Sequence, residues 1–365
     1  MNFFNVHNSE RSKKLALEVL SGSWIGEGAM AAEFERQLSA RLGLVNPVTV
    51  NSGTAALHLA LVIAGVGAGD EVIVPAQTFV ATAMVVMQCG AKPVFVDIDP
   101  QTGNMDAQDL KKRITEKTRA IIPVHYGGMV CNLSEIYYAA RGFDLSIIED
   151  AAQALGATYA GMPIGSISRF TCFSFQATKH ITTGDGGALC CLDENDAREA
   201  LRRRWFGIDR QNTKTAEEGN REFDINEVGY KYHLNDLAAA VGLGNLEELE
   251  ERLRRRREIA GIYREKLKNA PGVELLRLDE WQEPAYYIFT MLVEERLDFV
   301  RALRARCVPA SVCMRRIDRN TLFGGMRDDL PGTEYFDEHQ ISIPCHEGLS
   351  DEDVEMVVGA IKEGW

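Results

Sequence analysis

Between residues 48 and 192, short apolar segments rich in β-branched residues alternate with stretches of helical character. The clearest of these segments lie at 71–75, 92–97, 119–124 and 146–150. They are almost continuously apolar, which is typical of strands buried on both faces of a mostly parallel sheet. Each ends in a polar or proline-containing turn, and Asp97, His125 and Asp150 fall at such ends. Because ligands of open α/β sheets bind beyond the carboxyl ends of the strands, we expect the functional site there.

The pattern changes after residue 230. One long charged helix is predicted from about Leu234 through Arg257, and it connects to a strand at 287–293, a helix at 297–306 and a closing helix capped by Ser350. We therefore expect two domains, a large one at 1–250 that includes the N-terminal segment and a small α+β one at 251–365. The arginines of 252–257 follow acidic residues at helical spacing, such as Glu248 before Arg252, which favours a solvated, ion-paired helix face.

A lysine between two apolar segments is the strongest chemical signal. Lys179 follows the strand-like run 170–175 and precedes the glycine-rich stretch 183–187 and a second apolar run at 188–192. A carboxylate, Asp150, ends the strand before it. Pyridoxal phosphate needs an amine that forms a Schiff base and an anion that keeps its pyridine nitrogen protonated. Apolar surroundings lower the pKa of a lysine and favour the free amine. The alternative interpretation of Lys179 is a surface lysine on a hairpin.

Other residues fit the same cofactor, although each has a simpler interpretation. The segment 51–61 turns from a strand end into a helix, so Gly53, Thr54 and Ala55 can hold a phosphate at the helix N-terminus, unless Ser52 is only an N-cap. Further candidates are Ser174 for the phosphate, Gln153 for the phenolic oxygen and Phe79 for stacking on the pyridine ring. Alternatively, Asp150 only caps a following helix, and Phe79 and Ser174 are ordinary core and strand residues. His125 either lines the pocket or closes a strand.

Composition excludes several classes. The 365 residues carry a formal net charge of −13, which argues against a nucleic-acid partner. The sequence begins without the basic-then-apolar order of a signal peptide and contains no apolar stretch of membrane-spanning length, so we expect a cytoplasmic protein that does not insert into membranes. The eight cysteines form no Cys-x-x-Cys pair, which favours buried thiols over disulfides or a metal site.

Taken together, the motifs of almost the whole chain closely resemble the DegT/DnrJ/EryC1/StrS family of sugar aminotransferases, which are fold-type I pyridoxal-phosphate enzymes. The resemblance rests on several motifs in the family's order: Gly22-Ser-Trp-Ile-Gly-Glu-Gly28, Asn51-Ser-Gly-Thr-Ala-Ala-Leu57, Gly69-Asp-Glu-Val-Ile-Val-Pro-Ala-Gln-Thr-Phe79, Glu149-Asp-Ala-Ala-Gln153, Phe173-Ser-Phe175, Lys179 with its glycine loop, Gly229-Tyr-Lys-Tyr-His-Leu-Asn-Asp236 and Ile341-Ser-Ile-Pro344. It implies a three-layer α/β fold with a mostly parallel central sheet and a smaller α+β C-terminal domain.

The resemblance also implies roles for matching positions. Lys179 becomes the Schiff-base lysine and proton carrier, and Asp150 the partner of the pyridine nitrogen. Lys231 stands where many members have an asparagine that reaches the phosphate of the other subunit of a dimer. The segment 312–318 lacks the family's tyrosine-containing loop over the sugar site. Its Arg315 and Arg316 can meet the pyrophosphate of a nucleotide sugar, or are simply solvated.

The resulting hypothesis is transamination with glutamate as amino donor. The acceptor is the C-4 or C-3 keto group of a nucleotide-linked deoxy sugar, and a homodimer with shared active sites is expected. A keto-cyclitol acceptor remains an alternative. So does a sugar dehydratase, although that branch of the family resemblance has a histidine in place of Lys179. A binding or regulatory protein that has lost the reaction is a third alternative.

Overall fold

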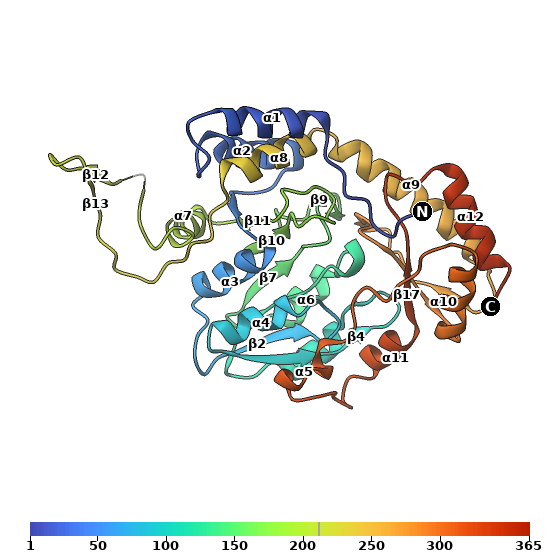
Figure 1. Cartoon of the computed structure of the whole chain (residues 1–365). Helices are drawn as coiled ribbons and strands as arrows, with labels where there is room; N and C mark the ends of the chain where they lie inside the picture. Colours follow the sequence, from blue (N-terminus) through green and yellow to red (C-terminus); the bar gives the residue numbers. More distant parts are fainter. Residues whose placement is uncertain (211) are drawn as a thin grey trace.

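The apolar segments of the first half of the chain form one sheet (Figure 1). Within the residues that the computed structural model describes, 1–210 and 212–365, this sheet has seven strands. In spatial order they are β1 (Pro47–Val50), β11 (Gly187–Cys191), β10 (Phe170–Ser174), β7 (Ser146–Asp150), β6 (Thr118–Ile121), β2 (Glu71–Pro75) and β3 (Lys92–Val96). Strand β11 is antiparallel to β1 and β10, and the pairs from β10 to β3 are parallel. The mostly parallel sheet is thus confirmed.

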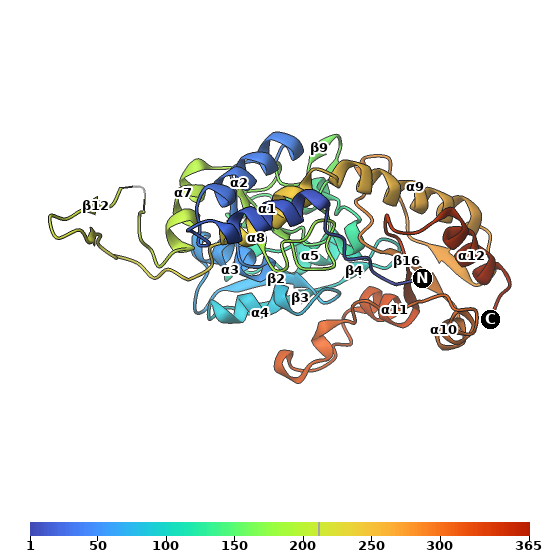
Figure 2. The ribbon, with the colours of Figure 1, turned by 45° about the horizontal axis from the view of Figure 1, so that its top comes forward.

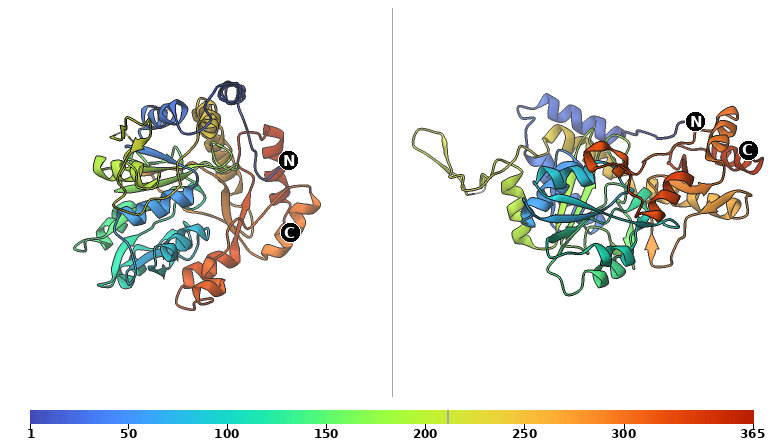
Figure 3. Two further views of the ribbon diagram at one scale, coloured as in Figure 1. Left: turned by 60° about the vertical axis from the view of Figure 1, so that its left-hand side comes forward. Right: turned by 90° about the horizontal axis from the view of Figure 1, so that it is seen from below.

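Helices cover both faces of this sheet, as Figure 3 shows. Successive strand residues point to opposite faces, so that Ile147 joins one apolar core and Ile148 the other. The first face packs against α1 (Glu10–Ser21), α2 (Ala29–Leu42), α5 (Ala107–Arg113), α6 (Leu133–Ala139) and α8 (Asp236–Leu246). The second face packs against α3 (Gly53–Ile63), α4 (Ala81–Gln88) and α7 (Glu194–Arg203). The result is the three-layer arrangement that the family resemblance implies.

The C-terminal part has a small sheet of its own. Its strands, in the order β14 (Val273–Leu275), β16 (Phe289–Val293) and β17 (Gln340–Ile343), are antiparallel. The helices of this part are α9 (Leu249–Leu267), α10 (Arg296–Ala305), α11 (Pro331–His339) and α12 (Asp351–Lys362). Ser350 caps α12 in a capping box with Asp353, as its position predicts.

Short elements connect these layers. Two-residue strands pair with one another: β4 (Ile98–Asp99) with β5 (Asn104–Met105), β8 (Thr158–Tyr159) with both β9 (Met162–Pro163) and β15 (Gln282–Glu283), and β12 (Lys214–Thr215) with β13 (Arg221–Glu222). Single 3₁₀ turns lie at η1 (Tyr126–Gly128), η2 (Ile317–Arg319) and η3 (Thr321–Phe323). The segment that carries β12 and β13 extends away from the body of the molecule (Figures 1 and 2).

The prediction of one helix from Leu234 to Arg257 is wrong, because α8 ends at Leu246 and α9 starts at Leu249. The reason lies in Asn245. Its buried side chain accepts a hydrogen bond from the Ser9 backbone and donates one to the Thr182 carbonyl, which fixes the end of α8 against two other segments. Glu248 then faces His7, at 2.7 Å, instead of Arg252.

The arginine-rich start of α9 is also less solvated than predicted. Arg252 and Arg256 are buried, and both pair with Glu347, at 2.6 and 2.9 Å. Arg256 also donates to the backbone carbonyls of Tyr286, Tyr287 and Cys345. The tract therefore connects α9 with the small sheet, and only part of it forms a solvated face.

The two predicted domains share several contacts. Ile317 and Leu330, from the C-terminal part, pack into the core of the second sheet face, whereas the N-terminal segment runs beside α9 and α12 (Figure 2). His346 Nε2 hydrogen-bonds with the carbonyl of Asn2, at 3.0 Å. The boundary near residue 250 stays a prediction.

Most of the thiols are buried, as the sequence predicts. Over the described part of the chain all eight cysteines are free, and Cys131, Cys172, Cys190, Cys191 and Cys345 are buried, although Cys307 is exposed. Across residues 1–210 and 212–365, no helix combines the length and apolarity that crossing a bilayer requires.

Candidate active site

Three strands of the sheet bring their carboxyl ends to one edge. Strands β1 and β10 run the same way because both are antiparallel to β11, and β7 is parallel to β10. Strand β1 leads into α3, β10 ends at Ser174 and β7 ends at Asp150. A Cβ atom on Gly53 would lie 2.9 Å from Ser174 Cβ, so only glycine lets the start of α3 lie this close to β10. The predicted residues Gly53, Thr54, Ala55 and Ser174 are therefore neighbours.

The N-terminus of α3 is partly occupied by its own cap. Ser52 Oγ accepts a hydrogen bond from the Ala55 backbone N–H, at 3.0 Å, so the N-cap interpretation of Ser52 is confirmed. The N–H groups of Gly53 and Thr54 precede the first helical hydrogen bonds and have no acceptor inside the helix. The positive end of an 11-residue helix, two N–H groups and the Ser174 hydroxyl make this corner suitable for a phosphate.

Asp150 is buried at the end of β7 and is held by two donors. Its Oδ2 accepts a hydrogen bond from the Thr82 hydroxyl, at 2.8 Å, and its Oδ1 accepts one from the Ala152 backbone, at 3.2 Å. Burial raises the pKa of this carboxyl, while the Thr82 hydroxyl, the Ala152 N–H and the charge of Lys179 counteract the rise. A carboxylate in this setting gains from a cationic N–H partner, which a protonated pyridine nitrogen provides.

Residues 151–156 form turns and not a helix, so Asp150 does not cap a following helix and Gln153 is not placed by helical periodicity. Its position is fixed instead by long-range contacts. Gln153 Oε1 accepts a hydrogen bond from the Gly127 backbone, at 2.8 Å, and its Nε2 faces Met314 Sδ, at 3.3 Å. The amide is thus fixed at the strand-end edge, and its contact with a phenolic oxygen stays a prediction.

Lys179 lies in the loop between β10 and β11 and is partly buried. Burial lowers the pKa of its amine to about 8, against the opposing effects of Asp150 and Cys313. The desolvation that we inferred from the sequence is thus confirmed, and a fully solvated lysine on a hairpin is excluded. Lys179 Nζ lies 4.3 Å from the centre of the Tyr287 ring.

Two predicted cofactor residues are exposed in this single chain. Phe79 follows β2 and is 62% exposed, so its ring is available for stacking. Lys231 is exposed, and its Nζ lies 5.6 Å from the centre of the Trp205 ring. The Lys231 carbonyl accepts a hydrogen bond from Asn51 Nδ2, at 3.2 Å, which places the backbone of Lys231 near α3 of the same chain.

His125 does not line the pocket. It is fully buried, its Nε2 lies 2.8 Å from Glu149 Oε2, and its Nδ1 accepts a hydrogen bond from the Cys131 backbone. Both ring nitrogens are therefore used inside the protein. The structure supports the alternative interpretation, in which His125 closes a strand.

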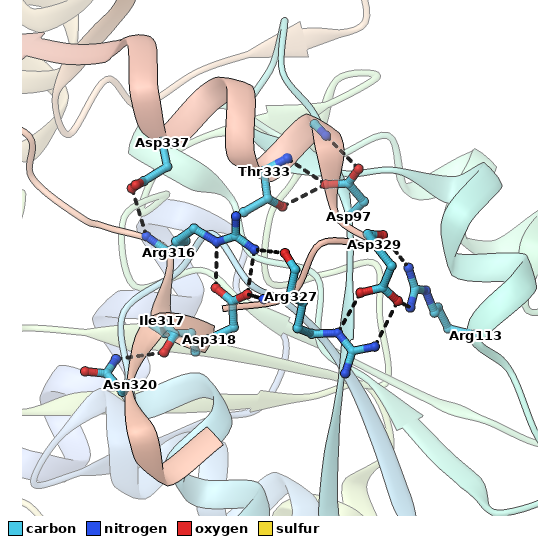
Figure 4. A network of polar contacts seen from close by, with 11 residues as sticks. Asp97, Arg113, Arg316, Ile317, Asp318, Asn320, Arg327, Asp329, Thr333 and Asp337 are labelled. Atoms are coloured by element: carbon cyan, nitrogen blue, oxygen red, sulfur yellow. Dashed lines mark hydrogen bonds and ion pairs between the residues drawn. The ribbon is translucent and has the colours of Figure 1, made fainter. Parts of the chain in front are cut away.

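Arg316 is not available to a pyrophosphate, because it is buried in the polar network of Figure 4. Its guanidinium makes a two-pronged ion pair with Asp318, at 2.8 and 2.6 Å, and donates to the Arg327 carbonyl. Arg315 is half exposed and pairs with Asp337, at 3.0 Å. These contacts hold the segment 314–318 in place, and the nearby Asp97 accepts hydrogen bonds from the first turn of α11.

The site contains three residues that the sequence did not single out individually: Thr82 against Asp150, Tyr287 against Lys179 and Met314 against Gln153. Thr82 follows Phe79 by three residues, but nothing in its surroundings distinguishes it from a core threonine. In the described ranges, no cluster of three or more His, Cys, Asp or Glu side chains is arranged to hold a metal ion.

Comparisons with known proteins agree with this geometry. The sequence pattern of the DegT/DnrJ/EryC1/StrS aminotransferase family matches residues 7–362. GDP-perosamine synthase of Caulobacter vibrioides is 35% identical over 95% of this chain and 93% of its own length. UDP-4-amino-4-deoxy-L-arabinose–oxoglutarate aminotransferase of Shewanella sediminis is 32% identical, over 97% of this chain and 95% of its own.

Solved structures give the same result. AtS13 from Actinomadura melliaura superposes with a TM-score of 0.95 and is 38% identical. The match covers 100% of this chain and 99% of the AtS13 chain. The pyridoxal-phosphate form of a putative sugar aminotransferase, Spr1654 from Streptococcus pneumoniae, superposes with a TM-score of 0.91 at 31% identity, over 100% and 98% of the two chains.

Proposed function

The chain belongs to the DegT/DnrJ/EryC1/StrS family of pyridoxal-phosphate-dependent aminotransferases, and we propose that it transfers the amino group of glutamate to a nucleotide-linked keto-deoxy sugar, at C-4 or C-3. One observation carries this proposal. The partly buried amine of Lys179, the buried carboxylate of Asp150 and the N-terminus of α3 converge on the edge where the sheet strands end. The names of two relatives contain GDP and UDP sugars, and one of them contains oxoglutarate, which supports the substrate class and the donor.

Different residues of this chain bind different parts of pyridoxal phosphate. Gly53, Thr54 and Ser174 hold the phosphate, because the start of α3 and the end of β10 offer donors to an anion. Asp150, which accepts hydrogen bonds from the Thr82 hydroxyl and the Ala152 N–H, would hold a proton on the pyridine nitrogen. When bound, pyridoxal phosphate supplies a carbonyl carbon that accepts amines and a ring that withdraws electrons from the carbon being deprotonated.

Lys179 would carry the proton that transamination moves from one carbon to another. With a pKa of about 8, its amine is poised near neutral pH, so it can accept a proton at one carbon and release it at another without a large energetic cost. The same amine would be the group that holds bound pyridoxal phosphate covalently.

The acceptor can be tested directly. Protein reconstituted with pyridoxal phosphate is incubated with glutamate and a panel of GDP- and UDP-linked 4-keto and 3-keto deoxy sugars, with keto-cyclitols as a separate group. We expect an aminated nucleotide sugar by mass spectrometry, formed in equal amount with 2-oxoglutarate. Lys179→Ala protein is the control and should form neither. Amination of a cyclitol alone would overturn the proposed acceptor class.

A homodimer with shared sites belongs to the same proposal. Residues 212–228, here called the arm, leave the body of the molecule (Figures 1 and 2) and expose three large apolar side chains, Phe223, Ile225 and Val228. The region around the end of α1 exposes Leu20 and Trp24. Apolar side chains on an extended segment are typical of a surface that a second copy covers.

Light scattering tests this surface. We expect the native protein to have twice the mass of one chain, and protein with Ile225→Asp and Val228→Asp together to have the mass of one chain. Leu297→Asp, at an equally exposed apolar residue on α10, is the matched control and should leave the mass unchanged. A native protein with the mass of a single chain would contradict the dimer.

A further inference from the structure

Lys179 has an aromatic neighbour in the small sheet region. Tyr287 precedes β16 by two residues, and the centre of its ring lies 4.3 Å from Lys179 Nζ. An ammonium group within about 6 Å of a ring face is attracted by the negative charge of that face. Tyr287 is itself 8% exposed, so little water competes for the contact.

The Tyr287 side chain is held by other segments of the chain. Its hydroxyl shares a hydrogen bond with the Thr178 hydroxyl, at 2.7 Å, next to Lys179 in the sequence. Its ring stacks on Phe4 of the N-terminal segment, with centroids 5.4 Å apart and planes at 26°. Arg256 of α9 donates to its carbonyl. The ring therefore has a fixed position when the lysine moves.

The charged surroundings of the amine are simple. Asp150 from β7 and Cys313 from the segment before η2 face Lys179, and His180 follows it in the chain. Burial raises the pKa of the Tyr287 phenol to about 12, so the hydroxyl stays neutral and does not act as a base. The ring face is consequently what Tyr287 offers to Lys179.

We propose that Tyr287 is a positioning residue for Lys179, and that its ring face holds the ε-ammonium group whenever this group is free and carries the proton that it transfers. This inference rests on the role proposed above for Lys179. It explains why an aromatic ring from a distant segment is fixed against the lysine loop by both a hydrogen bond and a stacked ring.

The first test measures the amine itself in cofactor-free protein, so it does not depend on catalysis. Acetic anhydride labels free amines, and mass spectrometry of the Lys179 peptide over a pH series gives the pKa of Lys179. In Tyr287→Leu protein the apolar cover remains but the ring face is lost. We expect this pKa to fall by about half a unit to one unit, the equivalent of one partly shielded cation–π contact.

Variants separate the ring from the hydroxyl. Tyr287→Phe keeps the ring face and should leave the pKa of Lys179 near its native value, as should Thr178→Val. Tyr286→Phe, which removes the hydroxyl of the adjacent tyrosine, is the matched control. If Tyr287→Leu protein does not fold, Tyr287→Met tests the same loss. An unchanged pKa in the leucine or methionine variant, or an equal shift in Tyr287→Phe, would overturn the proposal.

Kinetics provide the second readout. With the ring lost, Lys179 transfers its proton from a less defined position, so kcat should fall about tenfold while KM changes little. A fall in affinity with unchanged kcat would mean that Tyr287 contacts substrate instead. If Lys179→Ala protein kept full aminotransferase activity, the proposed role of Lys179 would fail, whereas the labelling result would still report on the contact of Tyr287 with the amine.

Discussion

At the scale of single residues, the charge of Asp150 depends on the hydroxyl of Thr82. This hydroxyl donates to Asp150 Oδ2 and lowers the pKa of a carboxyl that burial raises. Thr82→Val removes the donor, so the pKa of Asp150 rises further and the negative charge that faces the pyridine nitrogen is less well stabilised. Since a hydrogen bond to a charged group contributes about 1.5–3 kcal/mol, we expect pyridoxal phosphate to bind at least about tenfold more weakly.

An absorbance titration of cofactor-free protein with pyridoxal phosphate measures this effect. Thr82→Ser keeps a hydroxyl at the same position and is the control that should bind as the native protein does. Equal affinity in the valine and serine variants would show that Asp150 does not need this donor.

Residue chemistry determines which parts of the site can be predicted from the sequence. Lys179 and Asp150 stand out because few residue types supply an amine or an anion at a strand end. Thr82 and Tyr287 have ordinary side chains, and they reach the site through contacts that join positions 68 and 109 residues apart. Arg316 was wrongly proposed as a substrate residue. The sequence does not show that this loop arginine is buried in an ion pair with Asp318.

At the scale of elements, the ion pair of Arg316 with Asp318 fixes the segment that carries Met314 to the site (Figure 4). Both side chains are buried, so Arg316→Met leaves an unpaired buried carboxylate. We expect the free energy of unfolding to fall by about 3–5 kcal/mol. Adding Asp318→Asn removes the stranded charge and should restore a large part of that loss.

Urea unfolding measures both variants. Arg315→Met is the neighbouring control, because Arg315 is half exposed and its ion pair with Asp337 should contribute less than about 1 kcal/mol. If the single Arg316 variant were as stable as the Arg315 variant, the buried pair would not anchor the segment.

Glu347 couples α9 to the segment after β17 in a pH-dependent way. Although burial raises its pKa, the charges of Arg256 and Arg252 lower it to about 2 overall, from 4.5. A lowered folded pKa means that the ion pairs stabilise the fold above pH 4.5 and lose their effect as the pH falls toward 2. The shift corresponds to about 3 kcal/mol at neutral pH.

The comparison with Glu347→Gln isolates this effect. We expect the native protein to exceed the variant in free energy of unfolding at pH 7, and the difference to shrink steadily between pH 4.5 and pH 3. Glu355→Gln, at an exposed partner of Lys266, is the control and should show little difference at any pH. A difference that did not depend on pH would contradict the linkage.

The extent of the main elements was predictable, whereas their ends often were not. The predicted strand segments 71–75 and 146–150 have the same ends as strands β2 and β7 of the structure. Continuous apolar runs of this length are stable when they are buried in the central sheet. The break between α8 and α9 was not predicted. It arises from Asn245, whose partners Ser9 and Thr182 belong to remote parts of the chain. Helical periodicity continues across the break, so the sequence pattern alone does not show it.

At the scale of the whole molecule, Lys231 distinguishes a shared site from two independent ones. In this chain its backbone lies beside Asn51, near the phosphate corner of the same subunit, while the resemblance implies a contact with the partner. We prepare two defective proteins, Lys179→Ala and Lys231→Met, and mix them under conditions that exchange subunits. If Lys231 acts on the partner's site, a mixed dimer has one intact site and one with both defects.

A 1:1 mixture then regains about a quarter of the native activity, because half of the dimers are mixed and each has one working site. If Lys231 acts within its own subunit, every site keeps one defect and activity stays at the level of the two proteins assayed separately. Mass-tagged Lys179→Ala protein mixed with untagged native protein controls for exchange itself, because native mass spectrometry then detects mixed dimers directly. The same experiment therefore decides whether the lysine that replaces the family's asparagine works across the interface, and recovery requires that the protein be a dimer.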